Sequence, residues 1–284
     1  MSEYGALLQR IDDLERERDE SWRGQIGALR QEFEDLNKDF FLEVAAGRVA
    51  GTSCVNKFGE NPTVASGATE DIWDGSVAYV FPTTATITHI RAATNTASMR
   101  GLLIEMQGLD ANWDLVVQNA TLNGADSTTE VALTDVGVNL IRVFRLKVIA
   151  NVVGDSAVWI GATGVAAATA NAIIQAGNNQ TLMAIYTIPN GKTGYLTQYY
   201  RGFVKVTGAT PDSVEFNLWA ADRDNSYEFQ LKHSSAVQND AGAPVHPFQP
   251  YVKFTQKTDL KMTATSNGSG SHVHAGFDII LVDN

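Results

Sequence analysis

Residues 213–233, SVEFNLWAADRDNSYEFQLKH, decide the fold class of this chain. Apolar and polar residues alternate over positions 214–220, and a period of two is typical of a strand that buries one face. The polar residues DRDN at 222–225 then mark a turn, after which a second strand-like run begins. This stretch predicts an antiparallel β-hairpin.

Similar short runs, separated by turn signals, continue through the chain from residue 49 onward. Thr, Val, Gly, Asn and aromatic residues dominate there, and no long helical period remains. Asn123-Gly124 and Asn190-Gly191 are typical of hairpin turns. The predicted strands are 77–81, 85–92, 101–107, 113–120, 139–150, 156–161, 181–188, 193–206, 213–220, 226–233, 250–255, 259–265 and 273–282. A mainly β chain of antiparallel, jelly-roll-like sandwiches is therefore expected.

The first 48 residues have a different composition and a different period. They hold 19 charged residues, against 34 in the remaining 236. Their apolar residues are spaced by threes and fours, which average about 3.5 residues and predict a coiled-coil helix from about Tyr4 to Val44. Gly24 and Gly27 predict a break or kink within it. The seam consists of Tyr4, Leu7, Ile11, Leu14, Trp22, Ile26, Leu29, Phe33, Leu36 and Phe40.

A seam this narrow needs a partner, because one helix cannot cover its own apolar stripe. One alternative is that the helix packs against the β region of its own chain. The other is self-association, and bulky aromatic residues such as Trp22 and Phe33 fit a three-stranded core. We expect a homotrimer.

Three domains follow from these patterns. Residues 1–48 form the coiled-coil trimerisation segment, 49–168 a first β-sandwich domain with a joint loop over 58–75, and 169–284 a second β-sandwich domain. The order of strands after Phe81-Pro82 is similar to the order after Ile188-Pro189. We therefore predict two tandem domains, and an internal duplication is a hypothesis for their similar order.

Charge and composition exclude several classes of partner. The net charge is −11, with 21 Lys and Arg against 32 Asp and Glu, so a broad nucleic-acid surface is not expected. Cys54 is the single cysteine, which excludes an intrachain disulfide. No apolar run has the roughly 18 residues of a membrane span, and the charged N-terminus does not resemble a signal peptide. We expect synthesis in a cytoplasm and no membrane partner.

Candidate chemical motifs are incomplete in this sequence. Gly191-Lys192-Thr193 lacks the glycine of a phosphate-binding loop, since Tyr186 stands in its place. The acids in residues 70–75, EDIWDG, could serve a glycosidase, but such a loop more often caps turns and packs its tryptophan. No catalytic residue and no cofactor are predicted.

His272 and His274 alternate, so both side chains project from one face of a strand. Two imidazoles alone do not complete a metal site. Three chains on a trimer axis could supply the missing ligands. Without that symmetry the pair is a set of surface imidazoles, and no metal is predicted.

Several short strings in the β region are distinctive. They are VNKFGENP (55–62), EDIW (70–73), GLDANW (108–113), TLNG (121–124), NNQTLMA (178–184), YTIP (186–189) and GFDIILV (276–282). Over residues 55–284 the chain resembles a poorly characterised family of virion structural proteins of tailed bacteriophages. The resemblance implies a capsid decoration or fibre-like protein.

These observations lead to a non-enzymatic structural role. We expect a homotrimer that decorates and cements the capsid or projects as a short head fibre. Its partners would be itself and the major capsid protein or other virion proteins, in a virion assembled in the host cytoplasm. The alternative is a tail-fibre or receptor-binding adhesin that recognises host surface glycans. Its candidate surface contacts are Trp113, Trp219 and Tyr227.

Overall fold

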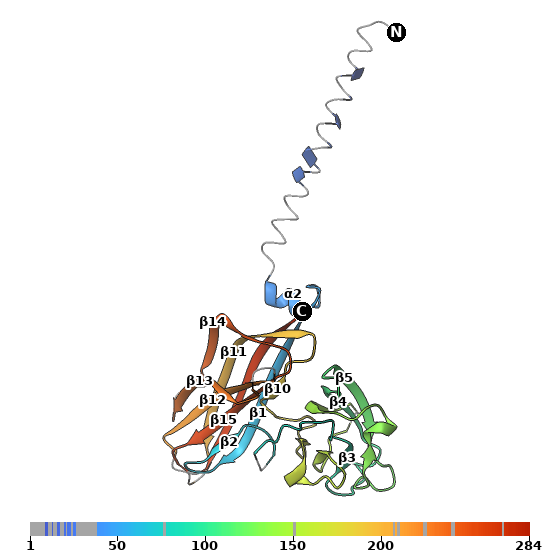
Figure 1. Cartoon of the computed structure of the whole chain (residues 1–284), viewed down its shortest axis with the longest axis vertical. Helices are drawn as coiled ribbons and strands as arrows, with labels where there is room; N and C mark the ends of the chain where they lie inside the picture. Colours follow the sequence, from blue (N-terminus) through green and yellow to red (C-terminus); the bar gives the residue numbers. More distant parts are fainter. Residues whose placement is uncertain are drawn as a thin grey trace. The chain divides into compact units, whose positions relative to one another are not determined.

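The computed structural model describes residues 9–10, 13, 16–17, 20, 22–23, 25–26, 39–75, 78–149, 152–206, 208, 211–223, 226–239, 242–268 and 270–284. The chain divides into two compact units, Met1–Ala50 and Gly51–Asn284 (Figure 1). In the second unit every sheet is antiparallel, and the described helices are two short 3₁₀ turns. The prediction of a mainly β chain is confirmed.

The described residues between 9 and 26 are helical, and a separate helix, α2 (Phe40–Ala45), follows. Asp39 precedes α2 with extended backbone and accepts hydrogen bonds from the N–H groups of Phe41 and Leu42, at 2.9 and 3.2 Å. A carboxylate at this position satisfies two of the free N–H groups of the first turn. The prediction of a helix that continues through to Val44 is therefore wrong at Asp39.

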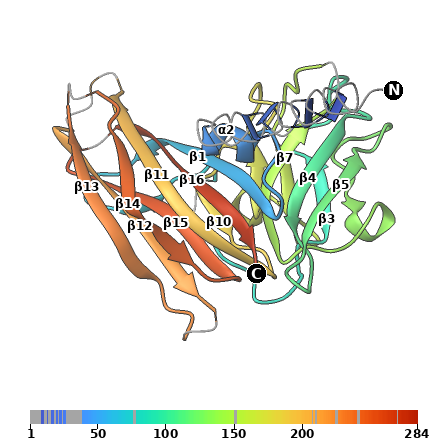
Figure 2. The same ribbon diagram turned by 90° about the horizontal axis from the view of Figure 1, so that it is seen from above.

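Two sheets form what we call the outer lobe (Figure 2). They include the last strands of the chain. The first sheet has the order β1 (Thr52–Val64), β16 (Ser271–Asp283), β11 (Lys192–Lys205) and β14 (Val245–Phe254). The second has the order β10 (Ile185–Thr187), β15 (Thr258–Ser266), β12 (Ser213–Asp222) and β13 (Gln230–Gln238), and β2 (Thr69–Asp71) also pairs with β15.

Alternation along these strands builds the core of the outer lobe. In β16 the residues Val273, Phe277 and Ile279 are buried, whereas His274 between them is exposed. They join Phe216 of β12 and Met262 of β15 in one hydrophobic cluster. The two sheets are thus held together by apolar burial, in a sandwich-like arrangement.

Two smaller sheets form a second group, which we call the inserted lobe because its strands lie between β2 and β10 in the sequence (Figure 1). One sheet has the order β6 (Val131–Ala132), β3 (His89–Ala92), β8 (Val158–Gly161) and β9 (Ala172–Ile174). The other has the order β5 (Leu115–Thr121), β4 (Leu103–Leu109) and β7 (Arg142–Val148). Both sheets contribute to a second hydrophobic cluster, to which Ile90, Met106, Leu146 and Ile160 belong.

The strand pairing differs from the predicted tandem division at 168/169. β1 pairs with β16 and β2 pairs with β15, so residues 52–71 belong with the C-terminal strands. β9 lies beyond the predicted boundary but pairs with β8 of the inserted lobe. The predicted joint loop over 58–75 also contains the end of β1 and all of β2. The lobes are nested in the sequence and not consecutive, because the first strand of the β region pairs with the last.

Two hairpins were predicted correctly and two turn signals were misread. β12 pairs with β13 as expected, and β4 pairs with β5, which confirms a hairpin predicted from Leu103 to Val117 with its turn at residues 110–112. The hairpins predicted at Asn123-Gly124 and Asn190-Gly191 are wrong, because β5 does not pair with β6 and β10 does not pair with β11. A turn sequence reverses the chain but does not choose the partner of the next strand. Residues 78–81 of the predicted strand 77–81 also lie outside any strand.

Candidate functional site

Three residues of the predicted seam fall within the described part of the chain. The side chains of Trp22, Ile26 and Phe40 are exposed by 61%, 55% and 51%. Trp22 and Ile26 are both helical and four residues apart, so they lie on one face. The other seam residues, Tyr4, Leu7, Ile11, Leu14, Leu29, Phe33 and Leu36, lie outside the described residues. Among the helices described, none has the length and apolar character of a membrane span.

Trp113, predicted as an exposed glycan contact, is instead buried, with 9% of its surface accessible. It follows β4 in the turn to β5 and has a positive φ of 69°. The guanidinium carbon of Arg142 lies 4.8 Å from the centre of its ring, and that of Arg223 lies 4.6 Å away. These cation–π contacts cover the indole, so the prediction that Trp113 meets a ligand at the surface is wrong.

Trp219 and Tyr227 are half-buried, and both polar groups already have partners. The indole N–H of Trp219 donates to the hydroxyl of Thr263 at 2.9 Å, and the hydroxyl of Tyr227 donates to Asp259. Burial, followed by the charge of Asp259, raises the pKa of Tyr227 to about 12. The structure does not bring Trp113, Trp219 and Tyr227 together as an exposed aromatic surface.

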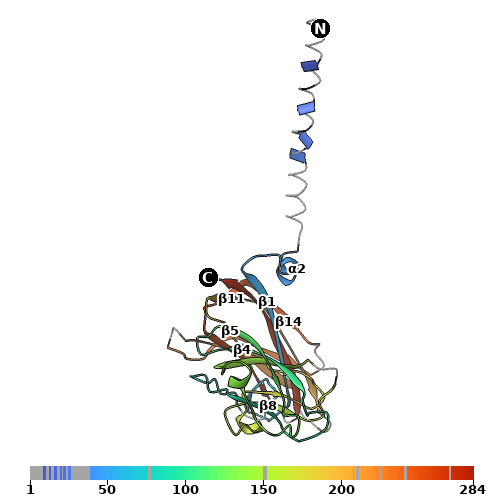
Figure 3. The same cartoon turned by 90° about the vertical axis from the view of Figure 1, so that its right-hand side faces the viewer.

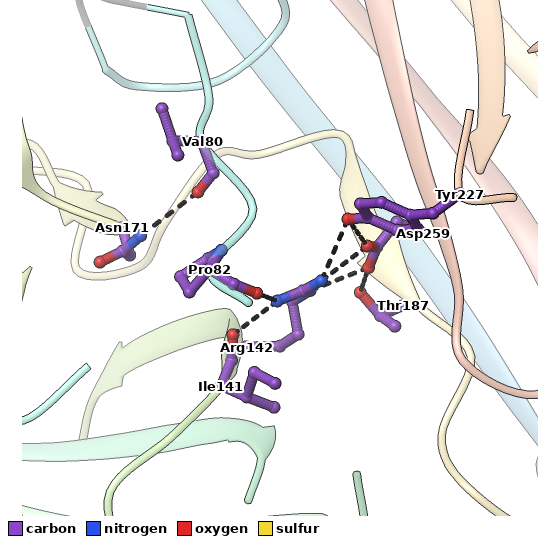
Figure 4. A network of polar contacts seen from close by, with 8 residues as sticks. All are labelled: Val80, Pro82, Ile141, Arg142, Asn171, Thr187, Tyr227 and Asp259. Carbon is purple, nitrogen blue, oxygen red and sulfur yellow. Dashed lines mark hydrogen bonds and ion pairs between the residues drawn. The ribbon is translucent and has the colours of Figure 1, made fainter. Parts of the chain in front are cut away.

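A buried ion pair joins the two lobes (Figure 4). Arg142 begins β7 of the inserted lobe, and Asp259 lies in β15 of the outer lobe. Nε and Nη2 of Arg142 donate to Oδ1 and Oδ2 of Asp259 at 2.8 and 2.6 Å, and the two side chains are 1% and 0% exposed. This bidentate geometry is the strong form of a charge-assisted hydrogen bond.

Neighbouring groups satisfy the remaining atoms of this pair (Figure 4). The hydroxyl of Thr187 donates to Asp259, and Nη1 of Arg142 donates to the carbonyls of Pro82 and Ile141, the latter at 2.8 Å. Each charge is therefore both paired and hydrogen-bonded, as a buried ion pair requires. We assign this network to holding the lobes together and not to chemistry.

The acidic loop at 70–75 is also engaged in the fold. Glu70 accepts hydrogen bonds from Asn61 and from the N–H of Ala65, and Asp71 accepts one from the N–H of Tyr79. Asp74 accepts one from the N–H of Leu182 at 2.6 Å. The tryptophan between them, Trp73, is 1% exposed. The interpretation that this segment packs its tryptophan is confirmed, whereas Glu70 and Asp71 lie in β2 and not in a loop.

Lys57 is a buried amine that no pattern in the sequence singles out. It lies in β1 beside a cleft of about 280 Å³ between β1 and the β4–β5–β7 sheet. Its ammonium group donates to the carbonyl of Phe144 in β7, so it ties the lobes together. Burial, followed by the charge of Arg145, lowers the pKa of Lys57 to about 7. Cys54, at the same cleft, has its pKa raised by burial and by Asp278, which disfavours a reactive thiolate.

The buried lysine predicts a pH-dependent stability. Below pH 7 Lys57 is charged in both the folded and the unfolded chain, so the full cost of burying its charge is present. That cost disappears as the pH rises from about 7 towards 10.5, because only the folded state releases the proton in this window. Lys57→Met should therefore gain most over the wild type near pH 6, and the gain should shrink by at most about 1.4 kcal/mol per pH unit above 7.

Urea unfolding at several pH values between 6 and 9.5 measures this difference. Lys253→Met, which removes an exposed lysine of β14, is the matched control and should run parallel to the wild type. A gain for Lys57→Met that is the same at pH 6 and 9.5 would contradict the prediction.

Another cluster of ionisable groups lies on the outward face of the β1–β16 pair. Register places Glu60 of β1 directly opposite His274 of β16, and His272 lies two residues before His274 on the same face. Directly opposed side chains are about 5 Å apart at Cβ, and diagonal ones are within reach of long side chains. The antiparallel pairing of the first and last strands therefore brings these three residues together.

Both imidazoles lie near the same carboxylate oxygen of Glu60. Nε2 of His272 lies 3.2 Å from Oε2 of Glu60, and Nδ1 of His274 lies 3.7 Å from the same oxygen. The imidazole rings are 4.3 Å apart at their centres. Burial and the neighbouring His272 lower the pKa of His274, against the opposing effect of Glu60.

No metal was predicted at His272 and His274, and the missing ligands were considered only from other chains on a trimer axis. The structure instead places a third candidate ligand, Glu60, beside them within the same chain. The signal that could have found it is the pairing of β1 with β16, and residues 58–75 were instead predicted as a loop. Glu60, His272 and His274 are the residues in the described part of the chain that could hold a metal.

No protein-family model and no curated protein matches this chain. Among solved structures, that of infectious bursal disease virus (Gx strain) aligns with 82% of this chain and 73% of the viral chain, at 10% identity and a TM-score of 0.19. A TM-score this low does not assign a fold.

Proposed function

We propose that this protein is a non-enzymatic virion structural protein, a homotrimer that decorates and cements a capsid or projects from it as a short head fibre. The distinctive strings of residues 55–284, similar to those of tailed-bacteriophage structural proteins, are the starting point. The finer architecture that goes with this proposal is a pair of jelly-roll-like sandwiches carried by a coiled coil.

The way the β unit is closed supports this role. Thr52, where β1 begins, pairs with Val282 near the end of β16, and the N–H of Asp283 donates to the carbonyl of Gly51 at 2.8 Å (Figure 3). The chain thus enters and leaves the β unit at one place. A β unit whose first and last strands are paired in this way suits a module that is anchored through the segment preceding its first strand.

Exposed apolar residues in the first unit support self-association. Trp22 and Ile26 share one helical face and expose 61% and 55% of their surface in the single chain. Phe40 and Leu42 of α2 expose 51% and 60%. Covering such side chains in a partner contributes about 25 cal/mol per Å² of apolar area removed from water. A homotrimer would bury them.

We expect this protein to bind to assembled capsid shells. Purified full-length protein is added to particles that lack it, and bound copies are counted by cryo-electron microscopy and gel densitometry. We expect many copies at symmetric capsid sites, because avidity multiplies weak contacts between symmetric partners. Density confined to the tail, with a bare shell, would overturn the decoration role and favour an adhesin.

A variant without residues 1–48 is the control for the anchor. It should remain folded by circular dichroism, sediment as a monomer and lose most of its binding to shells. The full-length protein should sediment as a trimer at micromolar concentration. A full-length monomer would contradict the homotrimer.

A further inference from the structure

We propose that Glu60, His272 and His274 bind a divalent transition-metal ion of the zinc class. This inference does not rest on the virion role, since it concerns a side-chain cluster within one chain. It begins from the geometry of three potential ligand atoms, one carboxylate oxygen and two imidazole nitrogens, all within 4.8 Å of one another.

The spacing of these atoms fits a small metal ion. Zinc binds imidazole nitrogen and carboxylate oxygen at roughly 2.0–2.2 Å, so two ligands at a tetrahedral angle lie roughly 3.3 Å apart. The distances from Oε2 of Glu60 to His272 Nε2 and His274 Nδ1 are 3.2 and 3.7 Å. The two imidazole nitrogens lie within 4.8 Å of each other, so binding an ion would draw the rings together until all three atoms reach ligand spacing.

The donor set selects the class of metal. Imidazole suits Zn²⁺, Cu²⁺, Ni²⁺ and Co²⁺, whereas Ca²⁺ and Mg²⁺ prefer oxygen ligands. A single ion pair between Glu60 and His272 would leave the second imidazole unused, because His274 Nδ1 is beyond hydrogen-bond distance from Glu60. A metal uses all three groups at once.

The surroundings leave room for the remaining ligand. A pocket of about 280 Å³ adjoins Glu60 and His274, with Phe58, Leu182 and Tyr200 among its walls. The side chains of His272 and His274 are 34% and 51% exposed, so an ion can reach the site from solvent. Three protein ligands with water in the open position is a common zinc arrangement.

The position of the site gives the ion a mechanical consequence. β1 is the edge strand of its sheet and is hydrogen-bonded there to β16 alone among the described strands. Glu60 comes from β1 and both histidines come from β16. A bound ion would link the first strand of the β unit to the last, and it would stabilise the folded state by mass action.

Isothermal titration calorimetry of the full-length protein, stripped with EDTA and titrated with ZnCl₂ at pH 7.5, tests the site. We expect one Zn²⁺ per chain, a rise in Tm on binding, and visible d–d absorption when Co²⁺ is used instead. Glu60→Gln, which keeps the shape of the side chain, and His274→Ala should each weaken Zn²⁺ binding by about 100-fold or more, since even indirect partners of a metal are worth 10–100-fold.

His89→Ala is the matched control, because His89 lies in β3 of the inserted lobe against Thr88 and Thr163. It should bind Zn²⁺ like the wild type. Binding of one ion per three chains would replace this site with one on a symmetry axis. Absence of binding, or equal affinity in Glu60→Gln and the wild type with both folded by circular dichroism, would overturn the proposal.

Discussion

Asp259→Ala is expected to lower the free energy of unfolding by about 3–5 kcal/mol, which is the usual cost of removing one partner of a buried ion pair. The variant leaves the guanidinium of Arg142, 1% exposed, without its bidentate acceptor. The hydroxyls of Thr187 and Tyr227 lose the same acceptor. Since Arg142 and Asp259 come from different lobes, the loss of their ion pair should also weaken the contact between the two lobes.

Chemical denaturation followed by circular dichroism measures the loss. Asp283→Ala is the control, since it breaks an ion pair to Lys192 whose side chains are 55% and 31% exposed, and exposed pairs contribute at most about 1 kcal/mol. The double variant Arg142→Met with Asp259→Leu should recover most of the stability, because it leaves no buried charge. Equal losses for Asp259→Ala and Asp283→Ala would show that the buried pair contributes no more to stability than the exposed one.

Gly59→Val is expected to destabilise the fold by about 3 kcal/mol or more, at the upper end of what overpacking costs. A Cβ atom at Gly59 would lie 2.4 Å from the backbone nitrogen of Ala184 and 2.5 Å from the carbonyl oxygen of Ile72. These two atoms are hydrogen-bonded to each other at 2.9 Å. Neither can move aside like the end of a side chain, so β1 itself would have to shift.

The matched control for Gly59 is Gly124→Ala. A Cβ atom added at Gly124 would have no atom within 4 Å, and Gly124 has no positive φ, so the methyl group meets open space. Its stability should stay within about 0.5 kcal/mol of the wild type. Thermal unfolding of both variants gives the comparison. A Gly59→Val protein as stable as Gly124→Ala would mean that β1 does not pass so close to Ile72 and Ala184.

The sequence predicts strands well where the pattern is local. The hairpin of β12 and β13 has alternating apolar residues and a polar turn, and its pairing was predicted correctly. β12 was predicted close to its observed bounds, whereas β13 was predicted at 226–233 and begins four residues later, at Gln230. β1 was missed because its residues 52–64 include Gly59, Asn61 and Pro62 and show no clear apolar alternation. Its partner, β16, lies more than 200 residues away, and only that pairing makes it a strand.

Long-range pairing also explains why the sequence did not predict the third residue of the candidate metal site. His272 and His274 are visible as a pair in the sequence, but nothing near them points to Glu60, which only the β1–β16 register brings opposite His274. Trp113 was expected at the surface as part of an exposed aromatic loop. Arg142 and Arg223, from distant parts of the chain, cover its ring. Long-range pairing, and not local propensity, determines both outcomes.

The adjacency of the two ends of the β unit sets how it responds to a pulling force. Residues 52–61 run antiparallel to 273–282, with Thr52 beside Val282. Tension between residue 51 and the C-terminus would break the hydrogen bonds of this ladder one pair at a time, starting at Thr52 and Val282. Breaking the pairs in sequence requires little force. Tension between residue 51 and the inserted lobe acts along β1 and loads all these pairs together in shear. A load carried through the inserted lobe should thus be resisted far better than one applied at the end of β16.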